Sequence, residues 1–167
     1  TTVDDMRLRV YPDPVLREPT LPVTEFDEAF RERIEKMVRI MHERDGVGLA
    51  GPQVGWSRQV AVVFDGEKNH VLVNPVIEST GGEQEGDEGC LSFPGIFTKV
   101  RRSKEVTVRA MDEYGKERTL SVEGFIARAF LHEIDHLNGR LLIDSMSPLK
   151  RSLLRKKMRR LEKDEEM

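Results

Sequence analysis

Apolar residues recur at spacings of three and four over residues 25–45, a period that predicts an amphipathic helix. Its apolar face comprises Phe26, Phe30, Ile34, Met37, Val38 and Met41. Thr24 is the expected N-cap, and Gly46 and Gly48 are expected to end the helix. The prolines of residues 12–22 predict an extended lead-in with little regular structure, because proline fixes φ and removes a donor.

Shorter apolar runs follow and predict strands. They lie at residues 60–64, 71–73, 76–77, 106–110 and 117–122. The Asn-Pro pair at 74–75 is expected to break one strand, and Pro94 and Gly95 are expected to interrupt another over residues 90–100. The acidic segment 79–89 is typical of a solvated loop or hairpin tip, and the glycine-rich segment 46–55 of a loop.

A third pattern covers residues 123–138, where apolar residues lie on nearly every side. Such a helix is a buried one, and Asn138-Gly139 should end it. Ser147 and Pro148 then supply an N-cap and a first-turn proline for a last helix. The apolar face of that helix comprises Leu149, Leu153, Leu154, Met158 and Leu161.

These elements together predict an α+β fold. Mainly antiparallel strands pack around the central buried helix, with an N-terminal amphipathic helix and a C-terminal helix beside them. No linker or internal repeat interrupts the pattern, so residues 1–167 are expected to form a single domain.

Composition excludes several classes of protein. Twenty-seven basic and thirty acidic residues give a net charge of −3, which disfavours a dedicated nucleic-acid binder. The sequence has no apolar run long enough to predict a membrane span. The one cysteine, Cys90, cannot form an internal disulfide, so the reducing cytoplasm is the expected location.

Candidate chemistry lies in the buried helix, which contains His132-Glu133-Ile134-Asp135-His136. Residues four apart share a helix face, so both imidazoles reach one cation with Glu133 beside it, as in the H-E-x-x-H pattern of metallohydrolases. Ionisable groups on a buried helix need partners, and the pattern therefore predicts a metal site. Asp135 is expected either to pair with Arg101 or Arg102 or to reach solvent.

Two histidines do not complete such a site, because a catalytic zinc-like centre takes three protein ligands and leaves a position for water. No histidine follows His136, and the carboxylates beyond it are Asp144 and those of the charged tail. Upstream, Cys90 offers a thiolate, a strong ligand for a borderline-soft cation. By residue type alone, Cys90 is either this ligand or a small core residue.

Three separated motifs resemble, in the same order, the signature motifs of the peptide deformylases. They are GVGLAGPQ at 46–53, EGCLS at 88–92 and HEIDH at 132–136, and YPDPVLR at 11–17 and SPLKR at 147–151 also resemble this family. The resemblance covers nearly the whole chain. It departs at Gly51, where many members have alanine, at Leu131, where glutamine is common, and over residues 93–99, which lack an arginine that some members use to contact substrate.

The resemblance implies an enzyme that removes the N-formyl group from the N-terminal methionine of nascent polypeptides and releases formate, in the cytoplasm or another bacterial-type translation compartment. It implies Cys90, His132 and His136 as ligands of one divalent metal ion. In this family the ion is usually Fe²⁺, with Zn²⁺, Ni²⁺ or Co²⁺ able to occupy the site. The ligand types alone do not choose among these ions.

Catalytic roles follow from that likeness and from general chemistry. A bound metal lowers the pKa of its water to about 7, and Glu133 is the candidate that accepts the water's proton and passes it to the leaving amine. The resemblance places the side-chain amide of Gln53 and the backbone N–H of Leu91 at the oxyanion.

Substrate contacts are expected from two glycines and two apolar helix residues. If Gly46 and Gly48 lie against the substrate, their missing side chains let a peptide backbone pair with them as a strand would. The alternative is that these glycines only form a turn after the first helix. Phe125 and Ala129 precede the metal-binding face of the helix and are candidates for a methionine pocket, or else ordinary core residues.

The last helix carries seven basic residues before its acidic end, namely Lys150, Arg151, Arg155, Lys156, Lys157, Arg159 and Arg160. They form either a solvated face or a local patch that docks on ribosomal RNA, which would suit an enzyme of nascent chains.

Two other functions compete with the deformylase interpretation. A general metallopeptidase is disfavoured because no third ligand lies downstream of His136. A structural metal module needs a fourth protein ligand, and no spacing in the sequence supplies one.

Overall fold

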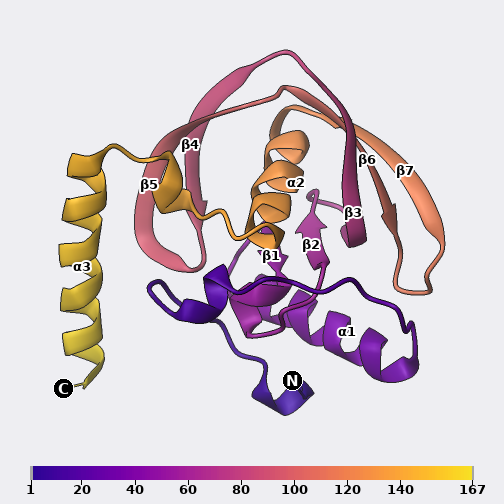
Figure 1. The fold of residues 1–167 in the computed structure, drawn as a ribbon, viewed down its shortest axis with the longest axis horizontal. Coiled ribbons are helices and arrows are strands. Elements are labelled where there is room, and N and C mark those ends of the chain that lie inside the picture. The colour runs from indigo at the N-terminus through magenta and orange to yellow at the C-terminus, as the bar shows by residue number, and fades with distance from the viewer. Residues whose placement is uncertain (1, 167) are drawn as a thin grey trace.

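Two β-sheets and three α-helices make up the described part of the chain (Figure 1). The structure is a computed structural model that describes residues 2–166, with side chains described for residues 2–160. Every strand pairing within the two sheets is antiparallel. The prediction of an α+β fold with mainly antiparallel strands is confirmed.

The larger sheet has the strand order β1-β2-β3-β6-β7. Its strands are β1 Gly48–Ala50, β2 Val60–Phe64, β3 Asn69–Gly81, β6 Glu105–Met111 and β7 Glu117–Glu123. The expected break at Asn74-Pro75 is wrong, because β3 continues through it. The register against β6 shifts between Val73 and Val76, and this irregularity accommodates a proline that cannot donate to the ladder.

The smaller sheet consists of β4 Gln84–Cys90 and β5 Phe93–Arg102. The expected solvated loop at 79–89 is therefore wrong over most of its length. Along β4 the buried or half-buried residues are Gln84, Gly86 and Glu88, while Glu85 and Asp87 are exposed. This alternation is that of a strand with one covered face, and the acidic composition conceals it.

The first helix, α1, spans Glu28–Glu43 and buries Phe30, Ile34, Met37, Ile40 and Met41. It begins later than expected because Asp27, not Thr24, is the N-cap: its carboxylate accepts a hydrogen bond from Phe30 N at 2.9 Å. The following glycine-rich segment is not a plain loop. It forms the short edge strand β1 and then the 3-10 helix Gly51–Val54.

The helix α2 spans Gly124–Leu137 and lies between the two sheets (Figure 1). It packs against β1, β2, β6 and β7 of the larger sheet. Asn138 is its C-cap and Gly139 has a left-handed φ of 74°, which ends the helix at the expected position. The sequence segment 132–136 lies in the last turns of this helix.

The last helix, α3, spans Pro148–Glu166 and lies at one end of the molecule (Figure 1). Ser147 Oγ accepts from Lys150 N at 3.2 Å, as expected of an N-cap. Leu154 and Met158 are buried against the smaller sheet, but Leu149 and Leu153 are exposed, so the predicted apolar face is too wide. Leu161 lies outside the described side chains. Within residues 2–166, no helix is long and apolar enough to cross a membrane.

Candidate active site

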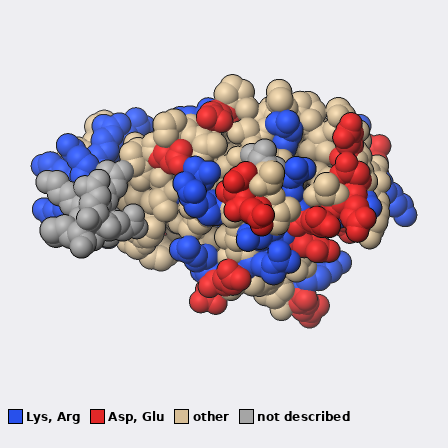
Figure 2. All heavy atoms as spheres, turned by 90° about the horizontal axis from the view of Figure 1, so that it is seen from below, with Lys and Arg blue, Asp and Glu red and all other residues tan. Residues whose placement is uncertain are grey.

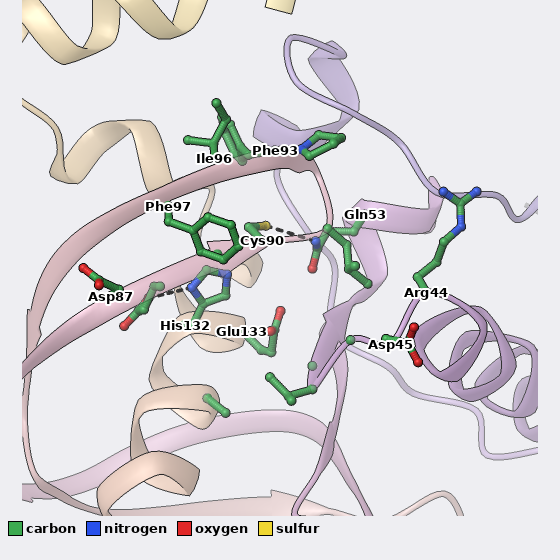
Figure 3. Close-up of a pocket in the computed structure, with 18 of the residues that line it drawn as sticks. Arg44, Asp45, Gln53, Asp87, Cys90, Phe93, Ile96, Phe97, His132 and Glu133 are labelled. Atoms are coloured by element: carbon green, nitrogen blue, oxygen red, sulfur yellow. Dashed lines mark hydrogen bonds and ion pairs between the residues drawn. The ribbon is translucent and has the colours of Figure 1, made fainter. Parts of the chain in front are cut away.

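A cavity of about 570 Å³ opens between β1, the β4–β5 hairpin and α2. The residues predicted for the site line it with one exception, His136, which is fully buried next to it. The lining includes Gly46, Gly48, Gln53, Cys90, Leu91, Phe125, Ala129, His132 and Glu133. Figure 3 shows Gln53, Cys90, His132 and Glu133 pointing toward a common space.

Three potential metal ligands converge at the inner end of this cavity. One ligand atom each from Cys90, His132 and His136 lies within 4.8 Å of the other two. Cys90 Sγ is 3.3 Å from His136 Nε2. The end of β4 supplies the sulfur, and one face of α2 supplies both imidazoles.

This donor set suits a metal ion. A thiolate and two imidazoles bind several divalent transition metals, and three protein ligands leave a position open for water. No fourth histidine, cysteine or carboxylate among the described residues joins the group. His136 Nδ1 is buried without a partner within the same part of the chain, so this ring is held by packing and has its Nε2 toward Cys90.

Glu88 orients the ring of His132. Its Oε1 lies 2.8 Å from His132 Nδ1, so the ring presents its other nitrogen, Nε2, toward the site. Arg102 donates from Nε and Nη2 to the two oxygens of Glu88, each at 2.9 Å. Burial raises the pKa of Glu88, but the hydrogen bonds and charges of Arg102 and His132 outweigh it and lower that pKa to about 2.

Asp135 pairs with Arg102, which is one of the two arginines expected for it. Arg102 thus bridges a carboxylate of β4 and a carboxylate of α2. This pairing fixes the helix that carries both histidines against the strand that carries Cys90.

Glu133 is buried in the cavity wall, and its Oε1 has no hydrogen-bond partner among the described residues. Burial raises its pKa to about 7; the charges of Glu88 and Asp135 also raise it, and those of His132 and Arg102 oppose the shift. A carboxyl group with a pKa near neutrality both accepts and donates a proton readily. This is the chemistry that a general acid–base residue would need.

The two histidines have opposite electrostatic surroundings. Burial lowers the pKa of His136 well below its usual value, and the charges of His132 and Arg102 lower it further. Burial also lowers the pKa of His132, but Glu133, Cys90 and Glu88 outweigh it and leave this pKa well above its usual value.

Gln53 is buried on the 3-10 helix beside β1, with both ends of its amide held. Oε1 accepts from Ala50 N at 2.9 Å, and Nε2 donates to Ser92 Oγ at 3.1 Å and to Cys90 Sγ at 3.4 Å. This fixes an N–H donor beside the sulfur. Leu91 follows Cys90 and packs so closely that a Cβ at Gly46 would be 2.6 Å from its Cδ1.

Gly48 leaves room for a neighbouring side chain. A Cβ at this position would overlap the carboxylate of Glu133. Two residues of α2 form the outer wall: Ala129 is buried, whereas Phe125 is 58% exposed at the mouth.

Comparison with known proteins identifies the family. The family model for polypeptide deformylase matches residues 6–152. The chain belongs to this family. The peptide deformylase of Thermotoga maritima is 48% identical to this enzyme over 153 residues, which cover 91% of this chain and 93% of that protein.

Solved structures agree with the sequence comparison. A peptide deformylase from Legionella pneumophila has a TM-score of 0.91 and 41% identity, and covers 96% of each chain. The structure of peptide deformylase from Thermotoga maritima has a TM-score of 0.83 and 45% identity, with 86% of this chain and 98% of that chain covered. The predictions of the family and of a deformylating enzyme are confirmed.

Sequence reasoning missed three buried polar residues of this deformylase site. Ser92 orients Gln53, Glu88 orients His132, and Arg128 donates to Glu88. Two signals were present in the sequence. Glu88 lies two residues before Cys90 on the same side of a strand, and Arg128 lies four residues before His132 on a helix that is otherwise apolar there.

Proposed function

We propose that residues 1–167 act as one catalytic domain that hydrolyses the N-formyl group of formylmethionine at the start of nascent polypeptides. Formate and a free N-terminal amine are the products. The observation that carries this proposal is the convergence of Cys90, His132 and His136 beside a cavity that the buried Glu133 also lines. Oε1 of Glu133 has no hydrogen-bond partner among the described residues.

Cys90, His132 and His136 would hold one divalent ion, and Fe²⁺ is the ion proposed in the cell. Zn²⁺, Ni²⁺ and Co²⁺ fit the same donor set. When bound, the ion would lower the pKa of a water molecule and polarise the formyl oxygen.

Glu133 moves the proton. As a carboxylate it accepts a proton from the water whose oxygen attacks the formyl carbon. As a carboxylic acid it then gives this proton to the amine nitrogen while the carbon–nitrogen bond breaks. Its pKa of about 7 suits both steps at neutral pH, and its burial keeps the proton from bulk solvent.

The developing oxyanion needs preset donors, and two are proposed. Gln53 Nε2 is held in place because it donates to Ser92 Oγ and because Oε1 of the same amide accepts from Ala50 N. The Nε2 N–H that points toward Cys90 Sγ is the one proposed to reach the oxyanion. The backbone N–H of Leu91 is the second donor. Each such donor is typically worth about 3–4 kcal/mol in the transition state.

The substrate lies in the same cavity. Ala129 and Phe125 are the proposed walls for the methionine side chain. Gly46 and Gly48 are proposed to lie along the peptide backbone. β1 is an edge strand of the larger sheet, and no other described strand pairs with its outer edge. An extended peptide could therefore pair with this edge.

A partner surface is proposed on α3. Figure 2 shows basic side chains gathered at the end of the molecule where α3 lies. Lys150, Arg155, Lys156, Lys157, Arg159 and Arg160 are exposed there, whereas the whole chain is net negative. A local cationic patch of this kind is suited to ribosomal RNA beside a nascent chain.

The function is tested with the peptides formyl-Met-Ala-Ser and acetyl-Met-Ala-Ser. The metal-loaded enzyme is expected to release formate from the first and no acid from the second. Glu133→Gln is expected to lose at least about a hundredfold in kcat while it binds metal as the wild type does. Cleavage of internal peptide bonds would indicate a general peptidase, and full turnover by Glu133→Gln would refute the proton-transfer role.

A further inference from the structure

Arg128 is a charged side chain buried inside the wall of the active site. It lies on α2, one turn before His132, and is only 8% exposed. Its Nη1 donates to Glu88 Oε2 at 2.8 Å, to the Val100 carbonyl at 3.1 Å and to the Gly86 carbonyl at 3.3 Å. Nη2 lies 3.4 Å from Gln84 Oε1. The guanidinium is therefore directed into the smaller sheet.

Glu88 receives hydrogen bonds on both oxygens. Oε1 accepts from Arg102 Nη2 and from His132 Nδ1, and Oε2 accepts from Arg102 Nε and from Arg128 Nη1. Two arginines thus clamp the carboxylate that orients His132. Rotation of Glu88 away from His132 would leave the buried charge of Arg128 without its carboxylate, which is costly.

We infer that Arg128 is a positioning residue of the metal site. It acts through Glu88, which keeps the Nδ1–H of His132 engaged and so presents Nε2 to the ion. The inference rests on the metal site proposed above. Hydrogen-bond partners of ligating histidines typically contribute ten- to hundredfold in metal affinity, and Arg128 is expected to act at the lower end of this range.

Two observations favour this role over direct substrate contact. Arg128 lines the cavity together with Phe125 and Ala129. Its hydrogen-bonding nitrogens nevertheless point toward β4 and β5, where protein acceptors engage them. The strand also makes room for the guanidinium, because a Cβ at Gly86 would lie 3.0 Å from Nη2. Arg128 therefore belongs to the support of His132.

The test measures Co²⁺ and Zn²⁺ binding by the metal-free full chain. Arg128→Met is expected to bind both ions about tenfold more weakly and to shift the visible absorption of the Co²⁺ form. Arg128→Lys, which keeps the charge and one donor, is expected to lie between Arg128→Met and the wild type. If Arg128→Met does not fold, the metal affinity of Arg128→Lys is compared with that of the wild type instead. Arg118→Met is the control, because Arg118 is a half-buried arginine that donates to the Val71 carbonyl outside the cavity.

A double-mutant cycle shows whether Arg128 acts through Glu88. In a Glu88→Gln background, adding Arg128→Met is expected to change metal affinity by less than about twofold. The inference would be overturned if both Arg128 variants had the metal affinity and Co²⁺ spectrum of the wild type. It would also be overturned if Arg128→Met weakened metal binding in the Glu88→Gln background as much as it does in the wild type. Two other results would contradict the proposed metal site itself and not only the role of Arg128. They are a wild-type chain that binds no ion, and a Cys90→Ser variant that binds the ion as tightly as the wild type.

Discussion

Gly48 illustrates how the side chain of a distant residue constrains the residue type at a backbone position. The sequence left open whether this glycine serves a turn or a substrate. In the structure it pairs with Val63 in a strand, and the space of its missing Cβ is occupied by the carboxylate of Glu133. A glycine here thus leaves room for Glu133, the proposed acid–base group, and only this contact across the fold reveals the reason for the residue type.

Gly48→Ala is expected to displace Glu133 and lower kcat by about tenfold or more, because misplacement of a reacting group by about 1 Å is costly. Metal affinity should be unchanged, since Cys90, His132 and His136 are untouched. Steady-state kinetics and metal titration measure both quantities. Gly81→Ala is the matched control, because its new Cβ would meet only the flexible end of Glu105 at 3.3 Å. Wild-type kcat in Gly48→Ala would show that Glu133 does not act from its observed position.

At the scale of elements, local sequence patterns predicted the helices and most strands. The start of α1 and the strand β4 were not predicted, because specific contacts with other residues determine them. α2 and β2 lie where periodicity places them. The start of α1 differs because two capping residues compete and Asp27 reaches Phe30 N. β4 is acidic in sequence, so its strand character arises from its pairing with β5 and from the two arginines that neutralise Glu88.

One ion pair joins two of the short helical segments. Arg17 ends the 3-10 helix Pro14–Arg17, and Asp144 lies in the 3-10 helix Leu142–Ser145. Arg17 donates from both terminal nitrogens to the Asp144 carboxylate at 2.8 and 2.9 Å. The hydrogen bond from Arg17 lowers the pKa of Asp144 below its usual 3.8, against a smaller opposing effect of burial. Because the folded pKa is the lower one, the pair stabilises the fold above pH 3.8 and loses this effect as the pH falls through the lowered value.

Asp144→Asn is therefore expected to lower the free energy of unfolding at neutral pH by at most about 1 kcal/mol, since both side chains are partly exposed. The difference from wild type should shrink in acid. Urea unfolding of both proteins near neutrality and below the usual pKa of aspartate measures it. A difference that is as large in acid as at neutrality would contradict the assigned role of this pair.

At the scale of the whole molecule, the site depends on segments that are distant in sequence. The H-E-x-x-H spacing alone predicted that the two histidines share one metal site with Glu133 beside it. Cys90 was ambiguous by residue type, because a ligand role depends on β4 ending beside α2. The resemblance to the family motifs favoured the ligand. Arg128 is part of no motif, and its hydrogen bonds to Glu88 and Val100 form only when α2 packs on the smaller sheet.

The charge of the molecule is also uneven at this scale. Replacing Lys156, Arg159 and Arg160 by glutamine is expected to weaken ribosome binding and to lower the slope of log affinity against log salt by about two to three. Deformylation of a formylated tripeptide should be unaffected, because these residues lie outside the cavity. Sedimentation with ribosomes at several salt concentrations measures the effect. The control replaces three basic residues elsewhere by glutamine: Arg7, and Lys36 and Arg39 on α1. Equal weakening of ribosome binding by this control would argue against docking through α3.

X-ray absorption spectroscopy of the Zn²⁺-loaded enzyme examines the metal centre itself. Its ligand shell is expected to contain one sulfur at about 2.3 Å, two imidazole nitrogens at about 2.0–2.1 Å and one further light atom from water. The sulfur signal should disappear in Cys90→Ser. A shell without sulfur, or one closed by a fourth protein nitrogen or sulfur, would show that Cys90, His132 and His136 do not form an open catalytic site.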